Sequence, residues 1–200
     1  MSNVYLKNFK LIVLWAIIFG LLAGLGSIFL PRQYSAQSQV LVISKDRSGV
    51  DPYTQAKSAE QIGGNLAQVM KTDDFYQRVL KTSYSFDKTR WTALSARKAR
   101  QQWNKDLEIS TVYGTGLMNI VAYSKTKKDA VDLATAVGQT VANEGWEYAG
   151  GNVLIKYVSG PLEPLFPSRP NYVLNICLGI FIGAVLCALW LAKYRRHNLF

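Results

Sequence analysis

LIVLWAIIFGLLAGLGSIFL, the stretch from Leu11 to Leu30, contains no charged residue. A second uncharged stretch, YVLNICLGIFIGAVLCALWLA, runs from Tyr172 to Ala192. Each has the roughly 20 apolar residues with which a helix crosses the ~30 Å hydrocarbon layer of a bilayer. We therefore predict two membrane-spanning helices, residues 11–30 and 172–192, near the two ends of the 200-residue chain, instead of a single soluble core.

A secretory signal peptide is the alternative for the first stretch, because Lys7 and Lys10 precede it. The stretch is longer than the ~7–15 apolar residues of a signal peptide, however. The segment from Ser27 to Leu30 also lacks the small-x-small pattern of a cleavage site. These features favour a permanent membrane helix.

Positive charges beside the two stretches predict the orientation. Two lysines precede the first stretch and Arg32 follows it, while three basic residues follow the second stretch and Arg169 precedes it. Lys and Arg flanking membrane helices remain mainly on the cytoplasmic side. We predict that residues 1–10 and 193–200 are cytoplasmic and that residues 31–171 form an extracytoplasmic domain. The cytoplasmic membrane of a bacterium fits this topology.

The segment 31–171 is mildly basic, since it carries 18 of the 23 Lys and Arg and all 13 Asp and Glu, a net charge of +5. These charges are interspersed, which favours a solvated surface, with an anionic lipid or polymer as the alternative contact. Nucleic acid is not an expected partner on this side of the membrane. Both cysteines, Cys177 and Cys187, lie in the second stretch. The domain therefore has no disulfide and depends on its core or on neighbouring subunits.

Hydrophobic periodicity predicts the elements of this domain. In chain order they are a strand (34–43), a loop (44–55), two consecutive helices within 57–81 of which the second begins at Thr72, a helix (89–104), a hairpin (107–111 and 118–122, with its turn at 113–116), a helix (127–148) and a strand (152–159). Strands before and after helices, without regular alternation, indicate an α+β domain with a small mixed sheet and about four helices.

Side-chain positions follow from the same periodicity. In the helix 89–104 the residues expected in the core are Trp91, Leu94, Ala99 and Trp103. The residues expected in water are Arg90, Arg97, Lys98 and Arg100, together with Lys105 directly after the helix. In the helix 127–148 the expected inner residues are Ala130, Leu133, Ala134, Val137, Val141 and Trp146.

Four prolines, Pro161, Pro164, Pro167 and Pro170, precede the second apolar stretch. Each fixes one φ angle and removes one backbone donor, so the segment 161–170 is predicted to be extended and semi-rigid. A plain spacer is the simplest interpretation.

The sequence offers little for catalysis. The only histidine, His197, falls in the predicted cytoplasmic tail, and no cysteine falls in the outer domain. Glu144 and Glu147 are the best candidates for a glycosidase pair, but residues three apart share one helix face, whereas a glycosidase places its carboxylates across a bond. We expect a non-enzyme without cofactor or metal.

Two glycine pairs, Gly20-x-x-x-Gly24 and Gly179-x-x-x-Gly183, lie one in each apolar stretch. Small residues one turn apart allow the backbones of membrane helices to approach closely. Glycine is also frequent in membrane helices, so chance is the alternative. We predict that these glycines pack the spans together and support a homo-oligomer.

Several phrases point to one family. They are Pro31, Tyr34 and Ala36 leading into VLVI, then NLAQVMKTDDFYQRVL, LMNIVAYS, KKDAVDLATAVGQTVANE and the proline run that enters the second stretch. In this order they resemble the chain-length determinant family, the polysaccharide co-polymerases, over nearly the whole chain. The long helical insertion of larger members is missing, so the resemblance is greatest to short members that accompany a bacterial tyrosine kinase in capsule or exopolysaccharide synthesis.

The resemblance implies a regulator that sets the length of a lipid-linked polysaccharide, with a polymerase and a cytoplasmic tyrosine kinase as partners. An adaptor that only activates the kinase is the alternative. Leu199 and Phe200 form an apolar end on a charged tail, which we predict to dock the kinase. Arg90, Arg97, Lys98 and Arg100 are candidates for weak contact with the polymer or polymerase, beside the simpler interpretation of a solvated face. The four prolines are expected to set the angle between the sheet and the second span.

Overall fold

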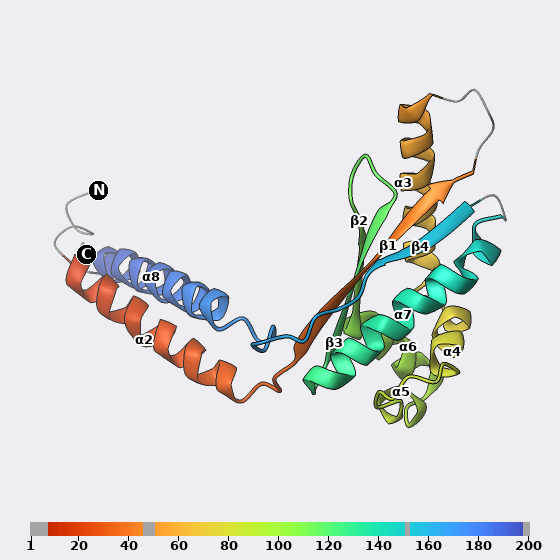
Figure 1. Ribbon diagram of the computed structural model, residues 1–200. Coiled ribbons are helices and arrows are strands. Elements are labelled where there is room, and N and C mark those ends of the chain that lie inside the picture. The colour runs from red at the N-terminus through yellow and green to blue at the C-terminus, as the bar shows by residue number, and fades with distance from the viewer. Residues whose placement is uncertain (1–7, 46–50, 151–152, 198–200) are drawn as a thin grey trace. The chain divides into compact units, whose positions relative to one another are not determined.

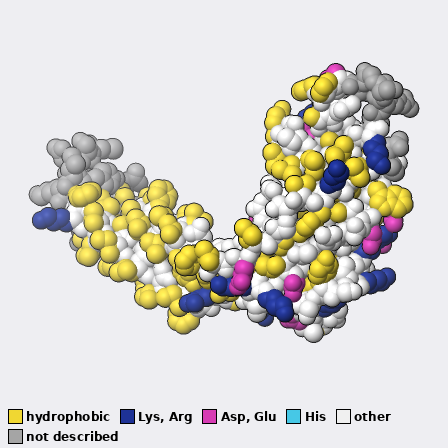
Figure 2. All heavy atoms as spheres, viewed as in Figure 1, with side chains coloured by type: hydrophobic (Ala, Val, Ile, Leu, Met, Phe, Trp, Pro, Cys, Tyr) yellow, Lys and Arg dark blue, Asp and Glu magenta, His cyan; other side chains and the backbone are white. Residues whose placement is uncertain are grey.

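The computed structural model describes residues 8–45, 51–150 and 153–197 and divides into two compact units. One unit consists of residues 1–32 and 168–200, and the other is the domain formed by residues 33–167. The first unit contains helices α2 (Phe9–Ile28) and α8 (Tyr172–His197), which pack along one another (Figure 1). Both helices are long and apolar enough to cross a membrane, which agrees with the two predicted spans. Hydrophobic side chains cover this helix pair in Figure 2.

The domain is built on a four-stranded sheet with the strand order β2-β3-β1-β4. The strands are β1 (Tyr34–Ser44), β2 (Leu107–Thr111), β3 (Leu117–Ser124) and β4 (Val153–Ser159). The predicted α+β class is confirmed, but all three pairings are antiparallel, so the expectation of a mixed sheet is wrong. β3 and β4 run in the same direction, yet β1 lies between them and pairs antiparallel with both.

The described residues of the domain form five helices: α3 (Pro52–Val69), α4 (Asp73–Leu80), α5 (Thr89–Thr92), α6 (Ala96–Asp106) and α7 (Lys127–Tyr148). α3 begins five residues before the predicted start at residue 57, so the end of the predicted loop is helical. Asp51 is the reason, because its side chain accepts a hydrogen bond from the backbone N–H of Thr54 (3.1 Å) and Pro52 occupies the first helical turn.

The predicted helix 89–104 is interrupted. Ser95 has an extended backbone (φ −63°, ψ 151°) and separates α5 from α6 as the N-cap residue of α6. The interruption turns Leu94 toward solvent, with 39 % of its surface exposed, so its predicted place in the core is wrong. Trp91, Ala99 and Trp103 are buried as predicted.

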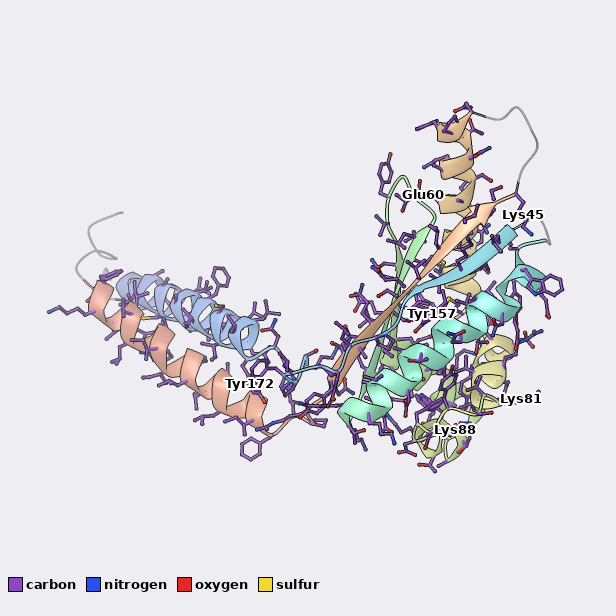
Figure 3. All side chains as sticks on the ribbon, in the orientation of Figure 1. Lys45, Glu60, Lys81, Lys88, Tyr157 and Tyr172 are labelled. Carbon is purple, nitrogen blue, oxygen red and sulfur yellow. The ribbon has the colours of Figure 1, made fainter. Side chains whose placement is uncertain are left out.

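α3 and α7 cover the same face of the sheet. The β1 residues on this face are buried (Ala36, Ser38, Val40 and Val42). Ser38 Oγ donates a hydrogen bond to the backbone oxygen of Ala134 in α7 (2.9 Å). Tyr157 of β4, labelled in Figure 3, lies so close to α7 that a Cβ atom on Gly138 would lie 2.6 Å from its ring. The absence of a side chain at Gly138 therefore allows α7 to pack closely against the sheet.

α7 has the predicted bounds, and its predicted inner residues are buried with the exception of Trp146, which is 50 % exposed. Gly145 faces the core instead, where a Cβ atom would lie 2.7 Å from Ile155 Cδ1. Successive helical residues are separated by about 100°. With Gly145 against the sheet, Trp146 therefore turns outward.

Candidate functional site

The glycine pairs lie at the interface between α2 and α8 of one chain. A Cβ atom on Gly179 would lie 2.6 Å from the backbone oxygen of Phe19, and one on Gly183 would lie 2.7 Å from that of Trp15. On α2, a Cβ atom on Gly20 would lie 2.7 Å from a side-chain atom, Cγ1 of Ile180. The glycines thus bring the two helices of a single chain into backbone contact. Contact between copies through these residues stays a prediction.

A hydrogen bond also joins the two helices. Asn175 Nδ2 donates to Ser27 Oγ (2.8 Å), and Ser27 Oγ donates in turn to the backbone oxygen of Ala23 (2.8 Å). Polar side chains in membrane helices typically find partners across helices in this way. Sequence reasoning missed the pair, although a lone Asn in an uncharged span was the available signal.

The basic residues proposed for polymer contact lie in different environments. Arg97 and Lys98 on α6 are exposed. Arg100 is 57 % exposed and forms an ion pair with Asp73 of α4. The expectation that Arg90 faces water is wrong, because its side chain is only 8 % exposed. Of the four, Arg97 and Lys98 are therefore exposed and form no ion pair with another described residue of the domain.

Arg90 belongs to a buried polar cluster around Asp106. Its Nη2 donates to Asp106 Oδ1 (2.8 Å) and its Nη1 donates to Ser124 Oγ (3.0 Å). Trp91 Nε1 and Gln102 Nε2 donate to the same carboxylate, at 3.1 Å and 2.9 Å. The cluster joins α5, the end of α6 and β3, so we assign it to the stability of the domain.

Glu144 and Glu147 share one cation. Arg78 Nη1 lies 3.0 Å from Glu144 Oε2 and 2.7 Å from Glu147 Oε2, while its Nε donates to Asp74 (3.1 Å). The hydrogen bonds to Glu144 and Glu147 raise the pKa of Arg78. Because both carboxylates engage one guanidinium, they link α4 to α7 and do not face one another across an open site.

Two of the hollows on the domain are lined by described residues. One, of about 380 Å³, lies among α4, α5 and α6, but its aromatic residues Tyr76 and Trp91 are only 6 % and 1 % exposed, so they offer little ring surface for stacking. The other, of about 310 Å³, lies beside the sheet and is lined by Gln37, Gln39, Ser159, Gly160 and Leu162. Among the described residues, no group of three or more His, Cys, Asp or Glu is placed to hold a metal.

The proline segment follows β4 without forming a helix or strand. Its large apolar side chains within the domain unit are exposed: Leu162 by 86 %, Leu165 by 80 % and Phe166 by 78 %. The proposed kinase-docking residues, Leu199 and Phe200, lie outside the described residues.

Comparison with known protein families gives a match for the N-terminal part of the chain. No curated protein matches the chain. The family model described as chain length determinant protein (Wzz) matches residues 2–83, a stretch that contains α2, β1, α3 and α4. In this N-terminal part, from the first apolar helix into the helical layer of the domain, the chain is similar to chain length determinant proteins.

Proposed function

We propose that this chain is a non-catalytic membrane regulator of polysaccharide chain length. The match of residues 2–83 to the chain length determinant family carries the proposal, since it spans both an apolar helix and the first elements of the domain. The described carboxylates best placed for chemistry, Glu144, Glu147 and Asp106, are engaged by Arg78 or Arg90, which favours a structural use of these groups.

The proposed setting is a bacterial cytoplasmic membrane with both termini in the cytoplasm. The two apolar helices of the first unit support it, together with the Lys and Arg that flank them. In this setting the domain is held at the outer surface, where a growing lipid-linked polysaccharide and its polymerase are accessible. A homo-oligomer of the chain is the proposed working form.

The test compares cells that make the polymer with and without the chain. With the chain present, the polysaccharide should show a narrow distribution of lengths on a gel, and without it a broad one. Total carbohydrate serves as the control, because a regulator of length leaves the polymerase active. An identical length distribution in both strains contradicts the proposal.

A cytoplasmic tyrosine kinase is a further proposed partner, through the tail 193–200. A docked aromatic end offers little area, so many tails on an oligomer would have to act together. Deleting residues 198–200 retains the basic residues that follow the span. It should prevent co-purification of the kinase while insertion and oligomer size are unchanged. Normal co-purification would make the tail an anchor only.

The four prolines are proposed to restrict the connection between the domain and the second span. Replacing Pro167 and Pro170 by Ala adds conformational freedom to this segment. The length distribution of the polymer should then broaden or shift at a normal protein level. An unchanged distribution would leave the segment as a plain spacer.

A further inference from the structure

The sheet has a second face, opposite to the one that α3 and α7 cover. Its β1 side chains alternate with the buried ones and are half-buried or exposed: Ser35, Gln37, Gln39, Leu41 and Ile43. Among the described residues of the domain, the helices that contact β1 are α3 and α7, on the other face. This face of the sheet is therefore accessible within the domain.

An uncharged polar row crosses this face over all four strands. The strand register places Ser110 of β2 opposite Asn119 of β3, Asn119 opposite Gln39 of β1, and Gln39 opposite Ser159 of β4. We call these four residues the polar row. With strands ~4.8 Å apart, the row is ~14 Å long, which suits a short stretch of an extended chain molecule.

Hydrogen bonds hold the amides of this face in place and leave part of each amide available. Gln39 Nε2 (2.8 Å) and the neighbouring Gln37 Nε2 (3.2 Å) both donate to Asn119 Oδ1. Within the described part of the chain, Gln37 Oε1, Gln39 Oε1 and Asn119 Nδ2 have no hydrogen-bond partner. Two acceptors and one donor are thus presented together.

Apolar surface and a hollow adjoin the row. The hollow of about 310 Å³ lies at its β4 end, between Gln39 and the exposed side chain of Leu162. Val121, half-buried, lies opposite Gln37 and beside the row. Few charged residues lie near the row. Glu108 of β2 accepts a hydrogen bond from the Tyr123 hydroxyl (2.8 Å), and Lys156 lies on β4 opposite Leu41.

We infer that the polar row binds an uncharged stretch of a polysaccharide chain, an assignment that rests on the proposed function. Sugar hydroxyls both donate and accept, and carboxamides offer both groups at a fixed separation. Leu162 and Val121 supply the apolar contact that the C–H faces of sugar rings require.

The experiment uses the full-length chain in nanodiscs. The probe is the polysaccharide that the producing cells attach to lipid, released by mild acid and labelled at its reducing end, and fluorescence anisotropy measures binding. Asn119→Leu removes the residue that holds both glutamines, and Gln39→Met removes one amide with little change in shape. Gln101→Met on α6 is the matched control, because Gln101 is exposed and lies outside the sheet.

The inference is supported if Gln101→Met binds the polysaccharide with the same affinity as the wild-type chain. For both proteins the affinity should be the same at low and high salt, since an uncharged contact is not screened. Asn119→Leu and Gln39→Met should each bind about tenfold more weakly, as expected for one lost set of hydrogen bonds. Circular dichroism checks folding, and Gln39→Met decides the matter if Asn119→Leu does not fold.

Equal binding by all variants, or no binding by the wild-type chain, overturns the inference. A change of oligomer size in Asn119→Leu also overturns it, because the row would then join copies of the chain. Polymer length in cells separates the two claims. If length depends on the chain while the variants bind normally, only the polar-row assignment fails. If length is the same with and without the chain, the proposed function fails as well.

Discussion

Arg90 and Asp106 form an ion pair inside the domain, with 2.8 Å between Nη2 and Oδ1 and side chains that are 8 % and 1 % exposed. A charged pair in such a place is stable only while both partners are present and their remaining hydrogen bonds are made. Here Ser124, Trp91 and Gln102 make those bonds. The pair and its hydrogen bonds thus hold α5, the end of α6 and the end of β3 together.

Replacing Asp106 by Asn should strongly destabilise the domain. Asparagine has nearly the same shape but leaves Arg90 as a buried cation without a counter-charge, which costs about 3–5 kcal/mol. Urea unfolding of the full-length chain in detergent, followed by tryptophan fluorescence, measures the loss. Asp73→Asn is the control, because the pair of Asp73 with Arg100 is exposed and should contribute little. Equal losses in both variants would contradict a special role of the buried pair.

Replacing Gly183 by Ala should loosen the helix pair. The added Cβ atom would lie 2.7 Å from the backbone oxygen of Trp15, so the helices must separate locally. Cys187, one turn along α8, is 1 % exposed and reports on this interface. Its modification by N-ethylmaleimide in detergent, measured by mass spectrometry, should become faster.

Gly26→Ala provides the matched control for that variant, since a Cβ atom there has no atom of a neighbouring element within 4 Å. Cys177 is exposed and should react at the same rate in all three proteins. Unchanged protection of Cys187 in Gly183→Ala would mean that the helix pair tolerates a larger residue at this position.

Replacing Gly116 by Ala should disrupt the start of β3. A Cβ atom would overlap with the backbone oxygen of Val42, whose N–H donates to the oxygen of Gly116 (2.8 Å). Because backbone atoms must move, we expect a loss of at least about 2 kcal/mol in the free energy of unfolding. Gly64→Ala, on α3 with open space around it, should instead gain about 0.5–1 kcal/mol. Similar urea midpoints for the two variants would contradict this.

Alkaline pH should weaken the contact between α4 and α7. Burial, and then the hydrogen bond that the Tyr148 hydroxyl donates to Asp74, raise the pKa of Tyr148 from 10.0 to about 12. The folded state therefore holds the proton more tightly than the unfolded state. The resulting stabilisation is complete below pH 10 and is lost as the pH rises through about 12.

Tyr148→Phe tests this dependence, because it removes the titrating group and keeps the ring. Wild-type urea midpoints should fall across that pH window more steeply than those of the variant. Tyr113→Phe is the control, since Tyr113 is 85 % exposed. A parallel fall in the wild-type chain and Tyr148→Phe would exclude Tyr148 as the cause.

Local signals were sufficient for α7 and failed for α5 and α6. α7 begins after Thr126, whose hydroxyl accepts from the N–H of Asp129 (3.1 Å), and its small and branched apolar residues recur at a helical period. Ser95 makes no such side-chain cap, and the polar run around it fits a continuous helix equally well. The interruption at Ser95 depends on tertiary packing, which the local sequence does not record.

Long-range pairings account for the other differences. Arg90 was predicted to be solvated because a charge on a helix usually is, yet its partners are 16 and 34 residues away in the sequence. The polar row was missed for a related reason. Alternation along β1 indicates two faces, but only the register shows that Asn119 lies beside Gln39.

The pairing of β1 with β4 also has a mechanical consequence. The chain enters the sheet at Tyr34 and leaves it at Ser159, and because the two strands are antiparallel both connections are at the same end of the pair. A pull that draws these connections apart acts first on the pairing of Gln39 with Ser159. It then opens the ladder one hydrogen bond at a time, so tension between the two membrane helices would peel β4 from the sheet instead of shearing it.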